Sequence, residues 1–265
     1  MLTNNRKLKG LVIRATDGEI GTVDQLYFDD QIWAVRYLTV ETGSWLNGRN
    51  VLISPHSIVQ TDWKAGRIDV SLTRKQVENA PDIDTHRPVS RQHEAAYYGY
   101  YGYPFYWDGP YMWGTAYTPG GMVPMATAES VVAERRHTES GDSHLRSTQA
   151  VTGYGIDAKD GDIGHVERFI VDDVTWAIRY LEVATKNWWP GKTVLLSPGW
   201  VERVSWEDSK VFVAVTREAI KTCPEYVDSE PITREYENQL YFHYGRPPYW
   251  IEEEKKASVL ALNGE

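Results

Sequence analysis

Cysteine is nearly absent from this chain. Cys223 is the only one among 265 residues, which excludes an intrachain disulfide. A single thiol suits a reducing compartment, and we expect Cys223 to be an inert thiol rather than a nucleophile. Long apolar runs are absent as well. No segment reaches the ~20 residues needed to cross a bilayer, and residues 1–6 lack the apolar stretch of a signal peptide. We therefore expect a cytoplasmic protein without a transmembrane segment.

Positive charge is also scarce. The chain has 28 Lys and Arg residues against 37 Asp and Glu residues, a net charge of −9. Binding to nucleic-acid phosphates requires a basic face. The two basic pairs of note, at 135–136 and 255–256, lie in polar segments. We therefore expect no nucleic-acid partner.

The familiar catalytic and ligand-binding motifs are missing. The sequence contains no GxSxG, no glycine-rich phosphate loop followed by Lys, no HExxH and no CxxC. Acidic pairs occur at 29–30 and 172–173, but adjacent strand residues point to opposite faces, so these carboxylates are poorly placed to act together. We expect a non-enzymatic protein that binds no metal and no cofactor.

The chain does contain a long internal repeat with a constant offset of 143 residues. Four matches define it: DGEIG at 17–21 with DGDIG at 160–164, WAVRYL at 33–38 with WAIRYL at 176–181, VLISP at 51–55 with VLLSP at 194–198, and YGYPFYW at 101–107 with YGRPPYW at 244–250. Solenoid units are only ~20–50 residues long, so this is a duplicated domain. None of the seven histidines is matched between the copies, and we find no matched nucleophile and base. This argues against a duplicated catalytic site.

Each copy begins with about seventy residues that favour short strands. Residues 33–41 form the clearest predicted strand, with Trp33, Val35 and Tyr37 on one face, and Asp-Gly at 17–18 favours a hairpin turn. Thr73 and Gln76 form a capping-box pattern that predicts a short helix, and Thr216 can cap its counterpart. Close-spaced strands followed by one helix predict a mainly β protein with two small closed barrels.

The organisation along the chain follows from the repeat. We expect a first domain at 1–107, a flexible linker at 108–147, a second domain at 148–251 and a frayed tail at 252–265. Each domain ends in an arm, at 88–107 and 231–250, that is rich in Tyr, Gly and Pro and lacks a clean period. We expect these arms to be irregular. They either pack on their own barrel or form a docking strip for the other barrel or another subunit.

Two arginines occupy the same position in both copies. Arg36 and Arg179 share a strand face with apolar residues, where an unpaired guanidinium is costly. We expect structural ion pairs, with Asp29 for Arg36 and with Asp172 for Arg179. An anion site that faces a cleft is the alternative.

Aromatic residues are abundant, with 11 Trp and 17 Tyr but only five Phe. Trp and Tyr are enriched where one end of the ring is buried and the other is wet, as at protein interfaces. The loop residues Trp45, Trp188 and Trp189 are candidate anchors for a partner, or they fold over the end of the barrel. The candidate interaction residues of the arms are Tyr101, Tyr106, Trp107, Tyr244, Tyr249 and Trp250.

These motifs, in this order and twice over, resemble the PRC-barrel domain. The resemblance covers about residues 8–82 and 151–226, and rests on GEIGTV at 18–23, the strand at 33–40, VLISP at 51–55 and VSLTR at 70–74, with their counterparts. It implies a small β-barrel that binds other proteins. The family includes the cytoplasmic domain of the photosynthetic reaction-centre H subunit, whose membrane helix this chain lacks.

The sequence therefore predicts a tandem-barrel adaptor with protein partners. Self-association and peripheral contact with a membrane stay open. One alternative is a peripheral protein similar to the H subunit that supports electron transfer. Another is a small-ligand binder or enzyme with a site between the barrels.

Overall fold

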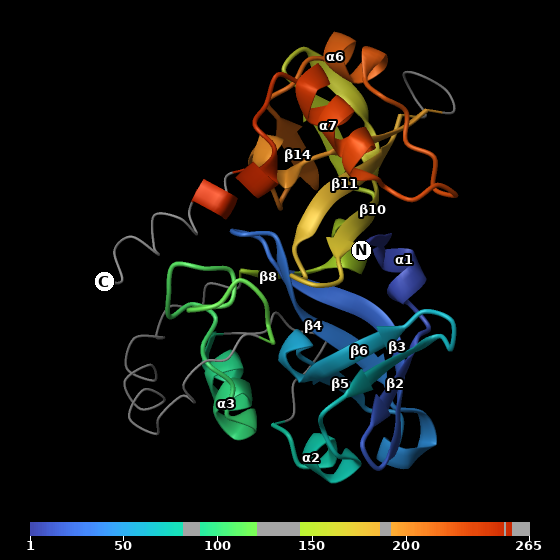
Figure 1. The fold of residues 1–265 in the computed structure, drawn as a ribbon, viewed down its shortest axis with the longest axis vertical. Coiled ribbons are helices and arrows are strands. Elements are labelled where there is room, and N and C mark those ends of the chain that lie inside the picture. Colours follow the sequence, from blue (N-terminus) through green and yellow to red (C-terminus); the bar gives the residue numbers. More distant parts are fainter. Residues whose placement is uncertain (82–90, 121–143, 186–191, 252, 256–265) are drawn as a thin grey trace. The chain divides into compact units, whose positions relative to one another are not determined.

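The computed structural model describes residues 1–81, 91–120, 144–185, 192–251 and 253–255 (Figure 1). The chain divides into two compact units. The first contains Met1, Thr3–Thr152 and Arg168–Arg179, and the second contains Leu2, Gly153–Glu167 and Tyr180–Glu265. The units therefore do not coincide with the two sequence copies, because residues 144–152 and 168–179 of the second copy belong to the first unit.

The first sheet has seven strands in the order β5-β4-β3-β2-β7-β6, with β8 paired to β3. Its strands are β2 (Val12–Ala15), β3 (Gly18–Asp29), β4 (Ala34–Glu41), β5 (Asn50–Ile53), β6 (Ile58–Asp62), β7 (Arg67–Val70) and β8 (Leu145–Ser147). Pairing is antiparallel throughout, except that β2 and β7 are parallel. Ile68 and Val70 point into the core from β7, as their alternation with polar residues predicts.

The second sheet repeats this order as β12-β11-β10-β9-β14-β13, with β1 paired to β10. Its strands are β1 (Leu2–Asn4), β9 (Gly155–Ala158), β10 (Gly161–Asp172), β11 (Ile178–Ala184), β12 (Thr193–Leu196), β13 (Val201–Ser205) and β14 (Lys210–Val213). The parallel pair recurs as β9 and β14. The expectation of a mainly β protein with two related halves is confirmed.

Strand pairing leaves both sheets open within the described residues. The ladder ends at β5 and β6 in the first sheet, and at β12 and β13 in the second. The chain enters a short 3₁₀ helix between these strands, η2 (Pro55–Ser57) and η3 (Pro198–Trp200). Each begins at a proline, which lacks the N–H that a ladder needs. A closed barrel is therefore not seen in the pairing.

The two helices expected after the sheets are present. Thr73 caps α2 (Arg74–Glu78) with a capping box closed by Gln76, and Thr216 caps α6 (Arg217–Thr222). Shorter helical turns include α1 (Asn5–Leu8), η1 (Gly43–Leu46) and α5 (Thr148–Val151).

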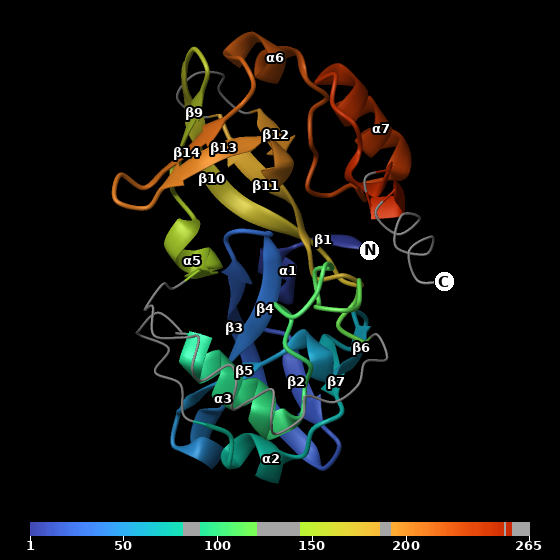
Figure 2. The ribbon, with the colours of Figure 1, turned by 90° about the vertical axis from the view of Figure 1, so that its left-hand side faces the viewer.

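The expectation that the arms are irregular was wrong. Both contain a helix, α3 (Arg91–Tyr101) in the first unit and α7 (Arg234–His243) in the second. Figure 2 shows α3 alongside the first sheet, where the Tyr97 hydroxyl donates to Leu52 O at 2.9 Å. The tyrosines give the arms no clear polar face in sequence. The tyrosine side chains form a buried helix face only when the helix packs against the sheet.

The expected linker at 108–147 also needs correction. Trp113 is fully buried in the first unit, and two β-bridges tie Tyr111 to Gly114 and Trp113 to Ala116. At the far end, residues 145–147 form β8. Residues 121–143 lie outside the described residues, as does most of the expected tail at 252–265. The ordered part of the first domain therefore extends beyond residue 107.

Candidate functional site

A carboxylate buried beneath α3 is the centre of a polar cluster in the first unit. Glu94 is fully buried. Its Oε1 accepts hydrogen bonds from the hydroxyls of Tyr37 at 3.2 Å and Tyr106 at 2.7 Å. Arg91, one turn earlier on α3, places Nη1 3.4 Å from Oε2. The cluster therefore joins the sheet, the helix and the segment that follows the helix.

The second unit contains the same cluster at the repeat offset. Glu237 on α7 is buried and accepts from Tyr180 at 2.7 Å and from Tyr249 at 3.1 Å. Arg234 lies 3.1 Å from its other carboxylate oxygen. Each of these four residues is the counterpart, 143 positions later, of one in the first cluster. We call the two sets the Glu94 lock and the Glu237 lock.

Sequence reasoning missed both locks. The histidines are not matched between the copies, and the arms show no clean period, so neither signal groups these residues. The signal is Arg-x-x-Glu followed by Tyr twelve positions after the Glu, at 91–106 and again at 234–249. The copies therefore do share a matched ionisable group, contrary to the impression from the histidines.

Three of the lock tyrosines stay protonated. Burial raises the pKa of Tyr37, Tyr106 and Tyr180, and the neighbouring glutamate raises each further. A protonated hydroxyl can donate to the carboxylate, and two such donors offset part of the cost of burying the charge. The arrangement can hold an arm helix on its sheet, and it places no hydroxyl in a state suited to nucleophilic attack.

The Glu94 lock has one additional member. His144 is buried, with Nε2 2.8 Å from Tyr106 Oη and 3.3 Å from Glu94 Oε2. The counterpart of His144 at the repeat offset is Met1, so the Glu237 lock has no matched histidine. The first lock therefore also fastens the start of β8 to the first unit.

Most of the expected interaction residues of the arms contact their own unit. Tyr106 is buried and lies 3.6 Å below the Arg36 guanidinium. Arg91 lies over Trp107 at 4.3 Å, and Arg234 lies over Trp250 at 3.9 Å. These cation–π contacts hold the arm within its own unit and are not contacts to a partner protein.

Tyr244 and Tyr101 complete the arm residues. Tyr244 packs against Trp200 at 4.5 Å between ring centroids, and burial raises its pKa. Tyr101 stacks on Tyr103 at 5.3 Å. Both rings are half-buried within their own unit, so packing accounts for most of their surface.

The two matched arginines lie beside the expected aspartates, both within the first unit. Arg36 is fully buried, 3.7 Å from Asp29, and donates to Met112 O at 2.7 Å. Arg179 lies 3.3 Å from Asp172. Burial opposes ionisation of Asp172, but the Val174 amide and Arg179 outweigh it and lower its pKa. Both pairs have the geometry of structural ion pairs.

The loop tryptophans have different outcomes. Trp45, on η1, is half-buried: its indole N–H donates to Ile20 O, and the Arg74 guanidinium lies 4.4 Å from its ring. The ring is therefore folded onto its own sheet. Trp188 and Trp189 lie outside the described residues.

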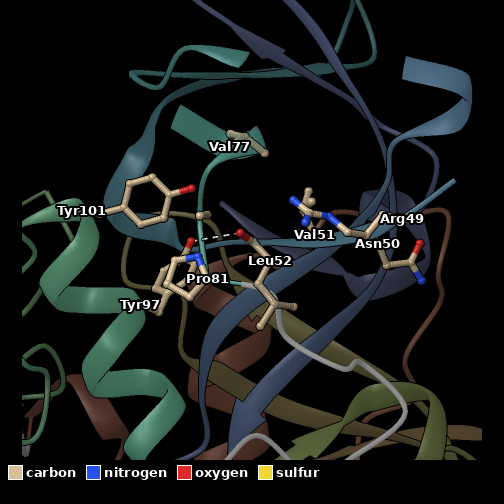
Figure 3. Close-up of a pocket in the computed structure, with 9 residues that line it drawn as sticks. Arg49, Asn50, Val51, Leu52, Val77, Pro81, Tyr97 and Tyr101 are labelled. Carbon is tan, nitrogen blue, oxygen red and sulfur yellow. Dashed lines mark hydrogen bonds between the residues drawn. The ribbon is translucent and has the colours of Figure 1, made fainter. Parts of the chain in front are cut away.

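A small hollow lies between α2, α3 and β5 in the first unit (Figure 3). Its lining residues are Arg49, Asn50, Val51, Leu52, Val77, Ala80, Pro81, Tyr97 and Tyr101. The Tyr101 hydroxyl has no hydrogen-bond partner within the described part of the chain, and burial raises its pKa. Its free volume of about 10 Å³ has room for about one water molecule, far below the ~300–1,000 Å³ of ordinary ligand pockets.

Within the described ranges, no three His, Cys, Asp or Glu residues gather as metal ligands would. No helix there is long and apolar enough to cross a membrane. The chain matches no protein-family model, and no curated protein matches it significantly.

His56 gives the first unit a predicted pH dependence. Its Nδ1 lies 2.6 Å from Pro119 O, so Nδ1 carries the proton, and Nε2 is buried without a partner among the described residues. Burial, with a smaller contribution from the Arg36 charge, lowers the pKa of His56 to about 4, although the hydrogen bond to Pro119 O opposes the shift. His56 is therefore protonated near pH 6.5 in the unfolded chain, but only near pH 4 in the folded chain. The free energy of unfolding should therefore fall as the pH is lowered from about 6.5 to about 4, by about 3 kcal/mol in total.

The test is His56→Asn, because the Asn amide keeps a donor near Pro119 O but does not titrate. Urea midpoints at pH 7.0, 5.5 and 4.5 should fall more steeply for the wild type than for the variant. Parallel pH profiles for the two proteins would contradict the assignment.

Proposed function

We propose that this protein is a non-enzymatic adaptor for other proteins, cytoplasmic and built from two domains of PRC-barrel type. The duplicated sheet order and the resemblance of the repeated motifs support the domain type. The locks and the cation–π contacts use the arm aromatics internally. The docking surface is therefore expected on the other side of an arm helix.

The observation that carries the proposal is the exposure of Phe242. This side chain on α7 is 89% exposed, the highest value among the large apolar residues that the structure describes as exposed. It occupies a helix face with Glu235, Asn238 and Gln239, all exposed. The chain has only five phenylalanines, and an aromatic ring with a polar rim is typical of an interface anchor.

The buried side of α7 makes this face rigid. Glu237, Leu240 and Tyr241 are all buried against the second unit, and Tyr241 packs edge-on against Trp200 at 5.4 Å. A helix fixed in this way presents Phe242 without an ordering cost at the moment of binding. Sequence reasoning missed Phe242 because the arm was expected to lack a helix and therefore a face.

Phe242→Ala should reduce capture of the protein's partners by at least tenfold, because removal of a hot-spot aromatic costs about 2 kcal/mol or more. The measurement is affinity capture of the full chain followed by quantitative mass spectrometry. Val59→Ala is the control, since Val59 on β6 is apolar and 68% exposed. If Phe242→Ala captures the same proteins in the same amounts as Val59→Ala, the α7 face is not the docking surface.

A further inference from the structure

The first unit contains strands and turns from both sequence copies. β8 of the second copy pairs antiparallel with β3, with Leu145 opposite Asp29 and Ser147 opposite Tyr27. Residues 168–179 contribute the Phe169 ring, 5.5 Å from Phe28. The Trp113 indole N–H donates to Thr175 O at 2.8 Å. The first unit is therefore incomplete without residues 144–152 and 168–179.

The contacts made by these segments are reciprocal. The Leu26 amide donates to Thr148 Oγ1 at 3.3 Å, and the Phe169 amide donates to Asn5 Oδ1 at 3.0 Å. Both donors and both acceptors are related by the offset of 143 residues. The Asp30 amide likewise donates to His144 O, and the Asp173 amide donates to Met1 O. Each copy gives its first strand and turn to the long strand of the other.

Ala34 and Ala177 lie at the centre of this arrangement and face each other in an antiparallel bridge. The flanking bonds run from Val35 N to Trp176 O at 2.8 Å and from Ile178 N to Trp33 O at 2.7 Å. This makes the alanines a non-hydrogen-bonded pair, whose Cα atoms are ~4.5 Å apart in such ladders. The two copies thus meet at equivalent residues, which is the defining property of a two-fold, self-complementary contact.

We infer that two chains form a closed dimer by exchanging segments. In this dimer, the first unit of each chain receives residues 144–152 and 168–179 from the other chain. Residues 121–143 separate these segments from the rest of the first unit in sequence. The same hydrogen bonds and ring contacts are available from a second chain. Because the contacts are reciprocal, an exchange in one direction is matched by the reverse exchange, so the assembly ends at two chains.

Concentration decides between the two arrangements. Segments of one chain compete with an effective concentration in the ~mM range, so pairing within one chain dominates in dilute solution. At high concentration, and above all during refolding when neither arrangement has formed, the second chain competes. The dimer should then persist after dilution, because exchange requires β8 and the bridge to separate from the first unit.

The test places single cysteines at the central pair. Ala34→Cys and Ala177→Cys are made separately in a Cys223→Ser background, denatured, mixed and refolded at about 1 mM chain. Non-reducing electrophoresis should show at least ten times more disulfide-linked dimer in the mixture than in either variant alone. Multi-angle light scattering of the refolded wild type should show the same dimer without a crosslink.

Two controls define the outcome. The double variant, Ala34→Cys with Ala177→Cys in one chain, should crosslink internally when refolded dilute, which shows that the pair can bond. Val59→Cys mixed with either single variant reports random collision, because Val59 is exposed. If the double variant crosslinks but the mixture gives no more dimer than the Val59 control, exchange between chains does not occur.

Discussion

Glu237→Ala should destabilise the second unit by about 3 kcal/mol, because it removes the acceptor of the buried Tyr180 hydroxyl and of the half-buried Tyr249 hydroxyl. The carboxylate accepts from Tyr180 at 2.7 Å and from Tyr249 at 3.1 Å. Arg234 loses its ion pair in addition. Tyr180 is fully buried, so water cannot reach its hydroxyl to replace the carboxylate unless the arm opens, whereas Tyr249 is half-buried. Differential scanning calorimetry and tryptophan fluorescence should both show that the second unit unfolds at a lower temperature in the variant.

Glu235→Ala is the matched control. Glu235 lies on the same helix, two positions earlier, and is exposed. Its loss removes only a charge in the first turn of the helix, which contributes about 0.3–1 kcal/mol. Equal melting temperatures for the two variants would mean that the Glu237 lock does not hold α7. Tyr180→Phe separates the parts further, since it removes a donor and leaves the carboxylate with Tyr249.

Gly164→Ala should be strongly destabilising, by about 3 kcal/mol or more, for a purely steric reason. A Cβ at residue 164 would lie 2.0 Å from the carbonyl oxygen of Ala184, and the backbone has φ +140°. The obstructing atoms are backbone of the neighbouring strand, which cannot rotate away. The first copy repeats the contact, with a Cβ at Gly21 meeting Glu41 O at 2.0 Å. The shared GxIG pattern therefore reflects a close approach of two strands.

Gly155→Ala is the control for this prediction. It lies on β9 of the same unit, and its nearest neighbour would be the flexible Lys210 side chain at 3.8 Å. The free energy of unfolding, measured by thermal melting, should change by less than about 1 kcal/mol for this variant. If the Gly164→Ala and Gly155→Ala variants have the same melting temperature, the two strands can move apart to admit the Cβ, and the steric prediction is wrong.

Local sequence patterns predicted the local structure well. Thr73 and Thr216 cap their helices because a side-chain oxygen reaches an amide only three positions away. Residues 67–70 form a strand whose alternation matches its burial. The constant offset of 143 residues predicted two sheets of the same strand order. Each of these depends on residues that are neighbours in the chain, or on comparison of the chain with itself.

The candidate site was predicted only in part. Tyr106 and Tyr249 were chosen for their type, but their role depends on a glutamate twelve positions earlier and a tyrosine 69 positions earlier in the chain. Such a cluster has no local period, so it cannot be recognised before the helix is placed on the sheet. The same holds for Phe242, whose exposure follows from which side of α7 the sheet covers.

The sequence by itself determined the duplication, the likeness of the two sheets and the helix caps of this protein. The placement of the arm helices, the two locks and the contribution of residues 144–152 and 168–179 to the first unit were settled by tertiary packing. The physical reason is that caps and alternation are satisfied within a few residues. A buried carboxylate or a shared strand edge is instead satisfied by whichever distant groups the folded chain brings within hydrogen-bond reach.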